Sequence, residues 1–115
     1  MAAIAWAACS AAEVPPPPDY AAGLRSTLDA ALAEGSNAAL ILFIARYPDE
    51  ALTDEARTAL AARRRLDAGY PGPDGDIFAA FDRARLAGPA ALAAFAATYS
   101  GHPLGAEARR AVWSR

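Results

Sequence analysis

The chain has 115 residues, a length that suits one domain with a modest hydrophobic core. A formal net charge of −2 together with 55% hydrophobic residues argues against a disordered chain, and a pI near 5.3 disfavours nucleic acid as a partner. Alanine, the residue of highest helix propensity, accounts for 34 positions, so the composition indicates an all-α protein whose helices pack closely.

Residues 1–18 combine an apolar start with a proline-rich stretch and are predicted to form a tether. Eight apolar residues precede Cys9, the only cysteine, which is too few for a membrane span of about 20 residues. The run "AWAACS" resembles the end of a bacterial lipoprotein signal, with Trp6 where an aliphatic residue is usual. Cys9 is therefore a candidate for lipidation, with an ordinary free thiol as the alternative. The "VPPPP" of residues 14–18 predicts a stiff polyproline II spacer, or otherwise a free tail or a ligand for a proline-binding groove.

The helical domain is predicted to span residues 19–115. Its first helix is capped by Asp19 and ends at Gly35, and its apolar residues recur at every fourth position: Tyr20, Leu24, Leu28 and Leu32. Ser36 caps the second helix, which Pro48 terminates.

The third helix is expected to open at Thr53 or Asp54. Its predicted inner face consists of small and aliphatic residues: Ala56, Ala59, Leu60 and Leu66. Three consecutive arginines lie toward its other end. The "GYPGPDGD" of residues 69–76 then breaks the chain, and three further helices are predicted at residues 77–87, 89–99 and 103–114.

Two stretches of the chain are similar. "NAALILFIARYPDEALTDEARTALAAR", from Asn37, aligns without gaps with "PAALAAFAATYSGHPLGAEARRAVWSR", from Pro89, at an offset of 52 residues. The matched residues include Leu40/Leu92, Phe43/Phe95 and Tyr47/Tyr99. Since these lie at i, i+3 and i+7, each set predicts one buried ridge. The two copies, about 19–69 and 76–115, suggest solenoid-like stacking, with the more apolar helix 37–47 inside the stack and helix 89–99 nearer an end.

The first copy also carries a spaced pattern of small, aromatic and charged residues: Ala39, Phe43, Tyr47, Pro48, Glu55, Ala56 and Arg57. This pattern resembles the divergent tetratricopeptide-like repeats of bacterial envelope proteins, such as the Tol–Pal-associated protein and the outer-membrane assembly lipoprotein. The second copy is similar to repeats found beside bacterial caspase-like domains. The chain departs from the usual spacing of about 34 residues and has Tyr99-Ser100 in place of Tyr-Pro. The resemblance implies an all-α right-handed array of two three-helix units that binds proteins and has no catalytic residues.

Candidate catalytic and metal-binding residues are sparse. His102 is the only histidine, and no recognised nucleophile motif or glycine-rich phosphate loop occurs in the sequence. We therefore expect neither an enzyme nor a cofactor or metal.

Arginines are the strongest candidates for a binding surface, because arginine is enriched in binding hot spots and grips carboxylates with two hydrogen bonds. The candidates are Arg57, Arg63, Arg64 and Arg65, which Arg109 and Arg110 could join. The alternative is a solvated face paired with Asp67 and nearby acids. Ile41 and Leu42 are apolar candidates, since they could face a partner or a second copy of the chain instead of the stack.

These features predict a non-catalytic scaffold that binds a protein or peptide in a bacterial envelope complex, in the periplasm or at the outer membrane. It would be lipid-tethered or secreted, with a lipid on Cys9 as its only membrane contact and no nucleic-acid partner. The alternatives are a homo-oligomeric structural module, an accessory domain of a larger cytoplasmic system, or a small hydrolase without a recognised motif.

Overall fold

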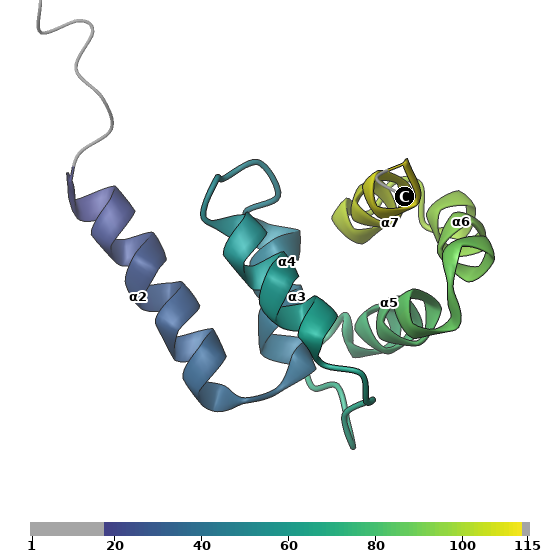
Figure 1. Ribbon diagram of the computed structural model, residues 1–115, viewed down its shortest axis with the longest axis horizontal. Helices are drawn as coiled ribbons and strands as arrows, with labels where there is room; N and C mark the ends of the chain where they lie inside the picture. The colour runs from purple at the N-terminus through teal and green to yellow at the C-terminus, as the bar shows by residue number, and fades with distance from the viewer. Residues whose placement is uncertain (1–17, 114–115) are drawn as a thin grey trace, which may run out of the picture.

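The computed structural model describes residues 18–113, and this part of the chain is all-helical, as the composition predicted (Figure 1). It contains six helices and no strand: α2 (Pro18–Glu34), α3 (Asn37–Arg46), α4 (Thr53–Ala62), α5 (Gly75–Ala87), α6 (Pro89–Thr98) and α7 (Pro103–Trp113). No helix in residues 18–113 is long and apolar enough to cross a bilayer. Cys9 and most of the proline-rich stretch lie outside the described residues.

The ends of α3 follow the local signals in the sequence, whereas α2 begins at Pro18, so Asp19 lies in its first turn and is not its cap. Ser36 caps α3 with extended backbone, and its hydroxyl accepts a 3.2 Å hydrogen bond from the Ala39 N–H. Gly35, with φ of 79°, takes the left-handed conformation that commonly follows a helix. At the other end of α3, the Tyr47 N–H donates to the Phe43 carbonyl directly before Pro48. The predicted boundaries of this helix are therefore confirmed.

Helix α3 is the centre of the packing. Consecutive helices pack together within α2–α4 and within α5–α7, and α3 also contacts both α5 and α7 (Figure 1). Leu40, Ile41, Phe43 and Ile44 of α3 are all at most 2% exposed. Helix α6 packs only on α5 and α7 and buries fewer residues. The prediction that α3 is internal to the packing and that α6 is more peripheral is therefore confirmed.

Several matched positions of the two similar stretches have matching environments. Leu40 and Leu92 are both buried, and so are Ala56 and Ala108. The Phe43 and Tyr47 rings lie 5.1 Å apart, and those of Phe95 and Tyr99 lie 4.7 Å apart. The predicted aromatic ridges therefore lie in or against the core.

The turn before the last helix of each stretch is also built alike. In the first stretch, the Thr53 hydroxyl donates to the Tyr47 carbonyl. The equivalent residue in the second stretch is Gly105, and a Cβ added there would collide with the Tyr99 carbonyl. In both turns, the start of a helix therefore packs closely on the carbonyl of the tyrosine that ends the preceding helix.

Three expectations are corrected. Ile41 is completely buried in the core of its own chain and offers no surface to a partner, whereas its neighbour Leu42 is 40% exposed. Leu66 is 49% exposed and does not belong to an inner helical face. Helix α4 ends at Ala62, so Arg63, Arg64 and Arg65 occupy the following loop instead of its last turn.

Candidate functional site

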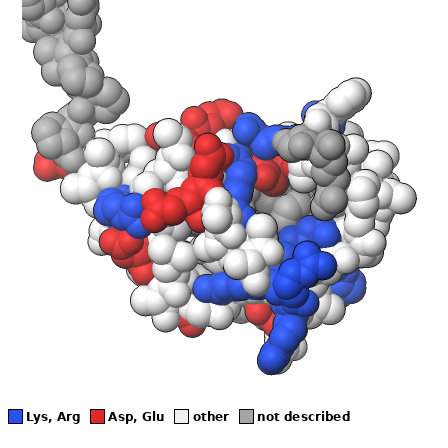
Figure 2. Space-filling view, in the orientation of Figure 1, with Lys and Arg blue, Asp and Glu red and all other residues white. Residues whose placement is uncertain are grey.

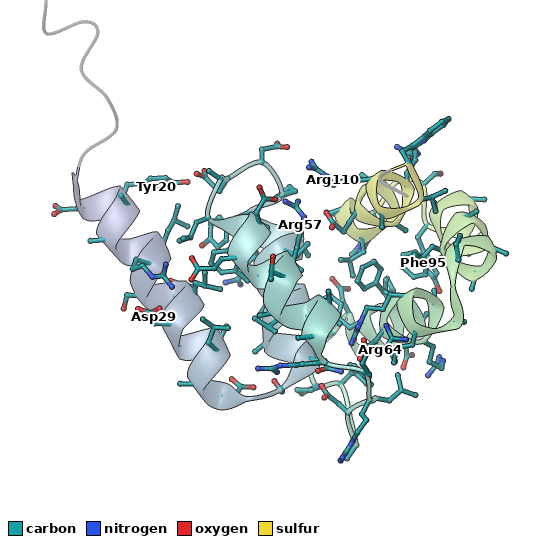
Figure 3. The ribbon with its side chains drawn as sticks, viewed as in Figure 1. Tyr20, Asp29, Arg57, Arg64, Phe95 and Arg110 are labelled. Carbon is teal, nitrogen blue, oxygen red and sulfur yellow. The ribbon has the colours of Figure 1, made fainter. Side chains whose placement is uncertain are left out.

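A pocket of about 250 Å³ lies between α3–α4 and α5–α7, and we call it the arginine pocket. Apolar side chains from α3, α4, α5 and α6 line it: Ile44, Leu60, Phe81 and Leu92. Four arginines and Glu107 also line it, together with Ala61 and Ala111. Figure 3 shows Arg57, Arg110 and Arg64 along the boundary between the α3–α4 half and the α5–α7 half. The pocket therefore combines an apolar lining with several positive charges.

Arg57 joins the two halves at this boundary. Its Nε and Nη2 atoms on α4 donate to the two carboxylate oxygens of Glu107 on α7, at 2.9 and 3.0 Å. Its Nη1 donates to Asp54 at 2.7 Å, and its Nη2 also donates to the Pro48 carbonyl at 2.8 Å. Burial lowers the pKa of Arg57, but the hydrogen bonds with Glu107 and Asp54 outweigh that effect and raise it overall. The positive charge of Arg57 is therefore stabilised, and its partner Glu107 is only 8% exposed.

Arg85 is held by a buried carboxylate on its own helix. Its Nε donates to Asp82 Oδ1 at 2.5 Å, and the Asp82 side chain is fully buried. The other oxygen, Oδ2, accepts hydrogen bonds from Asn37 Nδ2 at 2.9 Å and from the Tyr70 hydroxyl at 2.5 Å. The Nη2 atom of Arg85 is buried and has no hydrogen-bond partner among the described residues. Asp82 thus ties α5 to the start of α3 and to the loop that contains Tyr70.

The Asp82 network perturbs the ionisation of Tyr70. Burial and the hydrogen bond to Asp82 raise the pKa of the Tyr70 phenol to about 12. The same hydroxyl accepts a 3.1 Å hydrogen bond from the Asp67 N–H. The Asp67 carboxylate in turn accepts from the N–H groups of Asn37 and Ala38, at 3.2 and 2.9 Å, at the start of α3. Asp67 therefore caps α3, which corrects the interpretation that it pairs with the arginine cluster.

Arg64 and Arg110 provide the exposed charges of the arginine pocket. Arg64 lies two residues beyond the end of α4, is exposed, and forms no ion pair with any residue in the described range. Arg110, on α7, has a 51% exposed side chain whose Nε lies 3.8 Å from Glu107 Oε1. Since Glu107 is already bonded twice to Arg57, its contact with Arg110 is the looser one. The exposed positive charge thus comes from two separate parts of the fold, the loop after α4 and helix α7.

Acidic side chains gather elsewhere, along the contact between α2 and α4. Arg25 donates to Asp29 and to both oxygens of Glu55, and the Tyr20 hydroxyl donates to Glu50 at 2.7 Å. The hydrogen bond from Arg25 lowers the pKa of Glu55. Figure 2 shows these red side chains around one blue residue, and a separate blue cluster toward the α5–α7 half. On the face shown in Figure 2, charge is therefore unevenly distributed.

The structure unites only part of the predicted site. Arg57 and Arg64 lie in the arginine pocket, whereas Arg63 and Arg65 do not and line a second hollow, with Asn37 and Asp67, that Arg64 also lines. Leu42 lines a different apolar hollow of about 370 Å³ between α2 and α3. The sequence interpretation missed Arg85, although its i, i+3 spacing from Asp82 is a helical ion-pair signal. It also missed Glu107. No local signal marks this residue, and the matched residue of the first stretch, Glu55, is exposed and pairs with Arg25 instead.

His102 has a local structural role. Its Nδ1 accepts a 3.1 Å hydrogen bond from the Leu104 N–H at the start of α7, and its Nε2 lies 3.5 Å from Asp74. Among residues 18–113, no group of three or more His, Cys, Asp or Glu side chains is arranged to hold a metal ion. The histidine therefore contributes to the turn that begins α7.

No known family model matches this chain, and neither a curated protein nor a solved structure matches it.

Proposed function

We propose that this chain is a non-catalytic scaffold that binds a protein or peptide in the arginine pocket. In this proposal, α2–α4 and α5–α7 are two related three-helix units, stacked as a tetratricopeptide-like right-handed array. The matched burial of Leu40 and Leu92 and the similar turns at Thr53 and Gly105 support the relationship between the units. The pocket between them is the observation that carries the proposed function.

The lining of the arginine pocket suits binding. Protein interfaces place apolar anchors in desolvated pockets and are enriched in arginine. The pocket supplies an apolar floor through Leu60, Phe81 and Leu92, and exposed guanidinium groups at its edge. Arginine stays protonated at accessible pH and so cannot act as a general base. The carboxylate in the lining, Glu107, is engaged by Arg57.

Photocrosslinking tests this proposal directly. A photoreactive amino acid at Ala61, in the pocket, should give a discrete crosslinked species in the source cells, whereas the same residue at the exposed Ala22 on α2 should not. Adding Arg64→Glu should abolish the crosslink from Ala61. Arg83→Glu, an exposed charge reversal on α5 outside the pocket lining, should leave it intact. Equal crosslinking from Ala61 and Ala22, or a crosslink insensitive to Arg64→Glu, would contradict the proposal.

The bacterial envelope is the proposed site of action. In this extension, a lipid on Cys9 anchors the chain and the proline-rich residues 14–17, which precede α2, hold the helical domain away from the membrane. Metabolic labelling with a fatty-acid analogue should mark the wild-type chain and not Cys9→Ala. Equal labelling of both, or of neither, would remove the anchor and favour the cytoplasmic alternative.

The exposure of Leu42 favours a second candidate function, self-association. Leu42 is 40% exposed beside the hollow between α2 and α3, so a second copy of the chain could bury it. Light scattering at several protein concentrations should then show a dimer that Leu42→Glu dissociates. The matched control is Leu66→Glu, because Leu66 is similarly exposed at 49% and lies outside that hollow. A concentration-independent monomer would rule out self-association.

A further inference from the structure

The size of the arginine pocket limits what it can hold. Pockets for drug-sized ligands and cofactors usually enclose about 300–1,000 Å³. The volume of about 250 Å³ lies below this range and suits a single large side chain. The apolar surfaces of Leu60, Phe81 and Leu92 select an apolar side chain for that position.

Positive charge exceeds negative charge in the lining of the arginine pocket, where four arginines face the single carboxylate of Glu107. Arg57 is paired with Glu107 and Asp54, and Arg85 is paired with Asp82. Arg64 has no ion-pair partner among residues 18–113, and the exposed Arg110 shares Glu107 with Arg57 at the longer distance of 3.8 Å. The rim therefore presents two exposed guanidinium groups, one from each half of the array.

The pocket already holds a carboxylate in the geometry that arginine prefers. The Arg57 guanidinium grips Glu107 through Nε and Nη2, each bonded to a different carboxylate oxygen. Paired hydrogen bonds of this kind are the strong and directional form of carboxylate recognition. Further carboxylates at the rim would find donors in Arg64 and Arg110, whereas a basic ligand would meet two like charges.

We infer that the arginine pocket binds a peptide segment in which one large apolar side chain is flanked by acidic residues. The apolar side chain fills the floor formed by Leu60, Phe81 and Leu92, and the flanking carboxylates pair with Arg64 and Arg110. This inference rests on the proposed function and adds the chemistry of the bound segment. The uneven charge distribution of the surface supports it, since the acidic contact between α2 and α4 would repel the same segment (Figure 2).

An NMR titration of the full chain tests the inference. The probe is the blocked peptide Gly-Asp-Glu-Phe-Asp-Glu-Gly. Two matched peptides replace either its four acids by Asn and Gln or its Phe by Ala. We expect the probe to shift the backbone amides of Ala61 and Ala111, which line the pocket, and not that of Ala22. The amide peptide and the alanine peptide should each bind about tenfold more weakly or worse.

Charge-reversal variants supply the matched controls. Arg64→Glu and Arg110→Glu should each raise the dissociation constant of the probe about tenfold. Arg83→Glu and Arg109→Glu reverse exposed charges outside the pocket. They should leave the dissociation constant of the probe within about twofold of the wild-type value. All four side chains are exposed or partly exposed, so circular dichroism should show an unchanged helical fold. Added salt should weaken binding of the acidic probe and leave binding of the amide peptide unchanged.

The possible outcomes separate this inference from the proposed function. Equal binding of the acidic and amide peptides at Ala61 and Ala111 would overturn the inferred chemistry and leave peptide binding in place. Shifts at these amides from a single-stranded oligonucleotide and not from the probe would also overturn it. If no probe shifts these amides at millimolar concentration, the inference fails. If the photocrosslink from Ala61 is absent as well, the proposed function fails with it.

Discussion

Replacing Asp82 by alanine removes the acceptor at the centre of the polar network between α5, the start of α3 and the loop that contains Tyr70. Three donors converge on this carboxylate: Asn37 Nδ2, the Tyr70 hydroxyl and Arg85 Nε. Without Asp82, Asn37 Nδ2 would still donate to the Arg65 carbonyl. The Tyr70 hydroxyl would still accept a hydrogen bond from the Asp67 N–H. Arg85, with a side chain only 11% exposed, would lose its one ion-pair partner in the described residues.

The expected loss of stability follows from these contacts. Removing one member of a buried ion pair costs about 3–5 kcal/mol, because the remaining charge stays desolvated. Typical domains are stable by about 5–15 kcal/mol in total. We therefore expect Asp82→Ala to lower the free energy of unfolding by about 3–5 kcal/mol. The exposed Asp76, in the first turn of the same helix, is the control, and Asp76→Ala should cost about 0.3–1 kcal/mol.

Urea unfolding followed by far-ultraviolet circular dichroism measures both variants. If Asp82→Ala does not fold, adding Arg85→Met should restore folding, because it removes the uncompensated charge and keeps an extended apolar chain in its place. A loss below about 1 kcal/mol for Asp82→Ala would refute the reasoning, since it would mean that water solvates Arg85 freely. Failure of Arg85→Met to recover any stability would show that lost packing, and not charge, dominates the effect.

The remaining predictions concern other parts of the fold. Gly105→Ala should destabilise by about 1–3 kcal/mol in the same unfolding assay, because its Cβ would collide with the Tyr99 carbonyl. Gly101→Ala, with open space around its Cβ, should change little, and equal effects of the two would contradict the close approach of α7 to that carbonyl. Leu28→Ala should lower the free energy of unfolding by about 2–5 kcal/mol, because Leu28 is completely buried. A decrease below about 1 kcal/mol would mean that α2 does not pack on the core. The Tyr70 phenol should ionise near pH 12 instead of 10, so its contribution to stability is complete below pH 10 and is lost as the pH rises through 12. Ultraviolet titration of wild type and Tyr70→Phe should reveal this step, and ionisation of Tyr70 near pH 10 would contradict it.

Signals that act within a few residues were sufficient to place the helices. The Ser36 hydroxyl bonds to an N–H three residues along the chain, and Pro48 acts on the residue directly before it. Gly35 likewise ends α2 through its own backbone conformation. These effects require no tertiary contact, which is why the end of α2 and both ends of α3 could be predicted closely, whereas the end of α4 could not.

The arginine pocket depended on contacts that the sequence does not reveal. Arg57 and Glu107 are 50 residues apart, and Asn37 and Asp82 are 45 apart, yet each pair is hydrogen-bonded. Because the sequence does not reveal these partners, it could not distinguish Arg57 from the other arginines of a solvated basic cluster. Its pairing with Glu107 depends on how α4 lies against α7, which no local pattern specifies.

By itself, the sequence determined the all-α character of the described region, both ends of α3 and the matched aromatic ridges, because helix propensity, capping and apolar spacing act locally. The tertiary structure alone decided which of the adjacent residues Ile41 and Leu42 is buried, since both lie on an almost uniformly apolar helix. It also decided which arginines share a pocket. The physical reason is the same in both cases: burial and ion pairing depend on the rotation and placement of whole helices, and many distant side chains set these together.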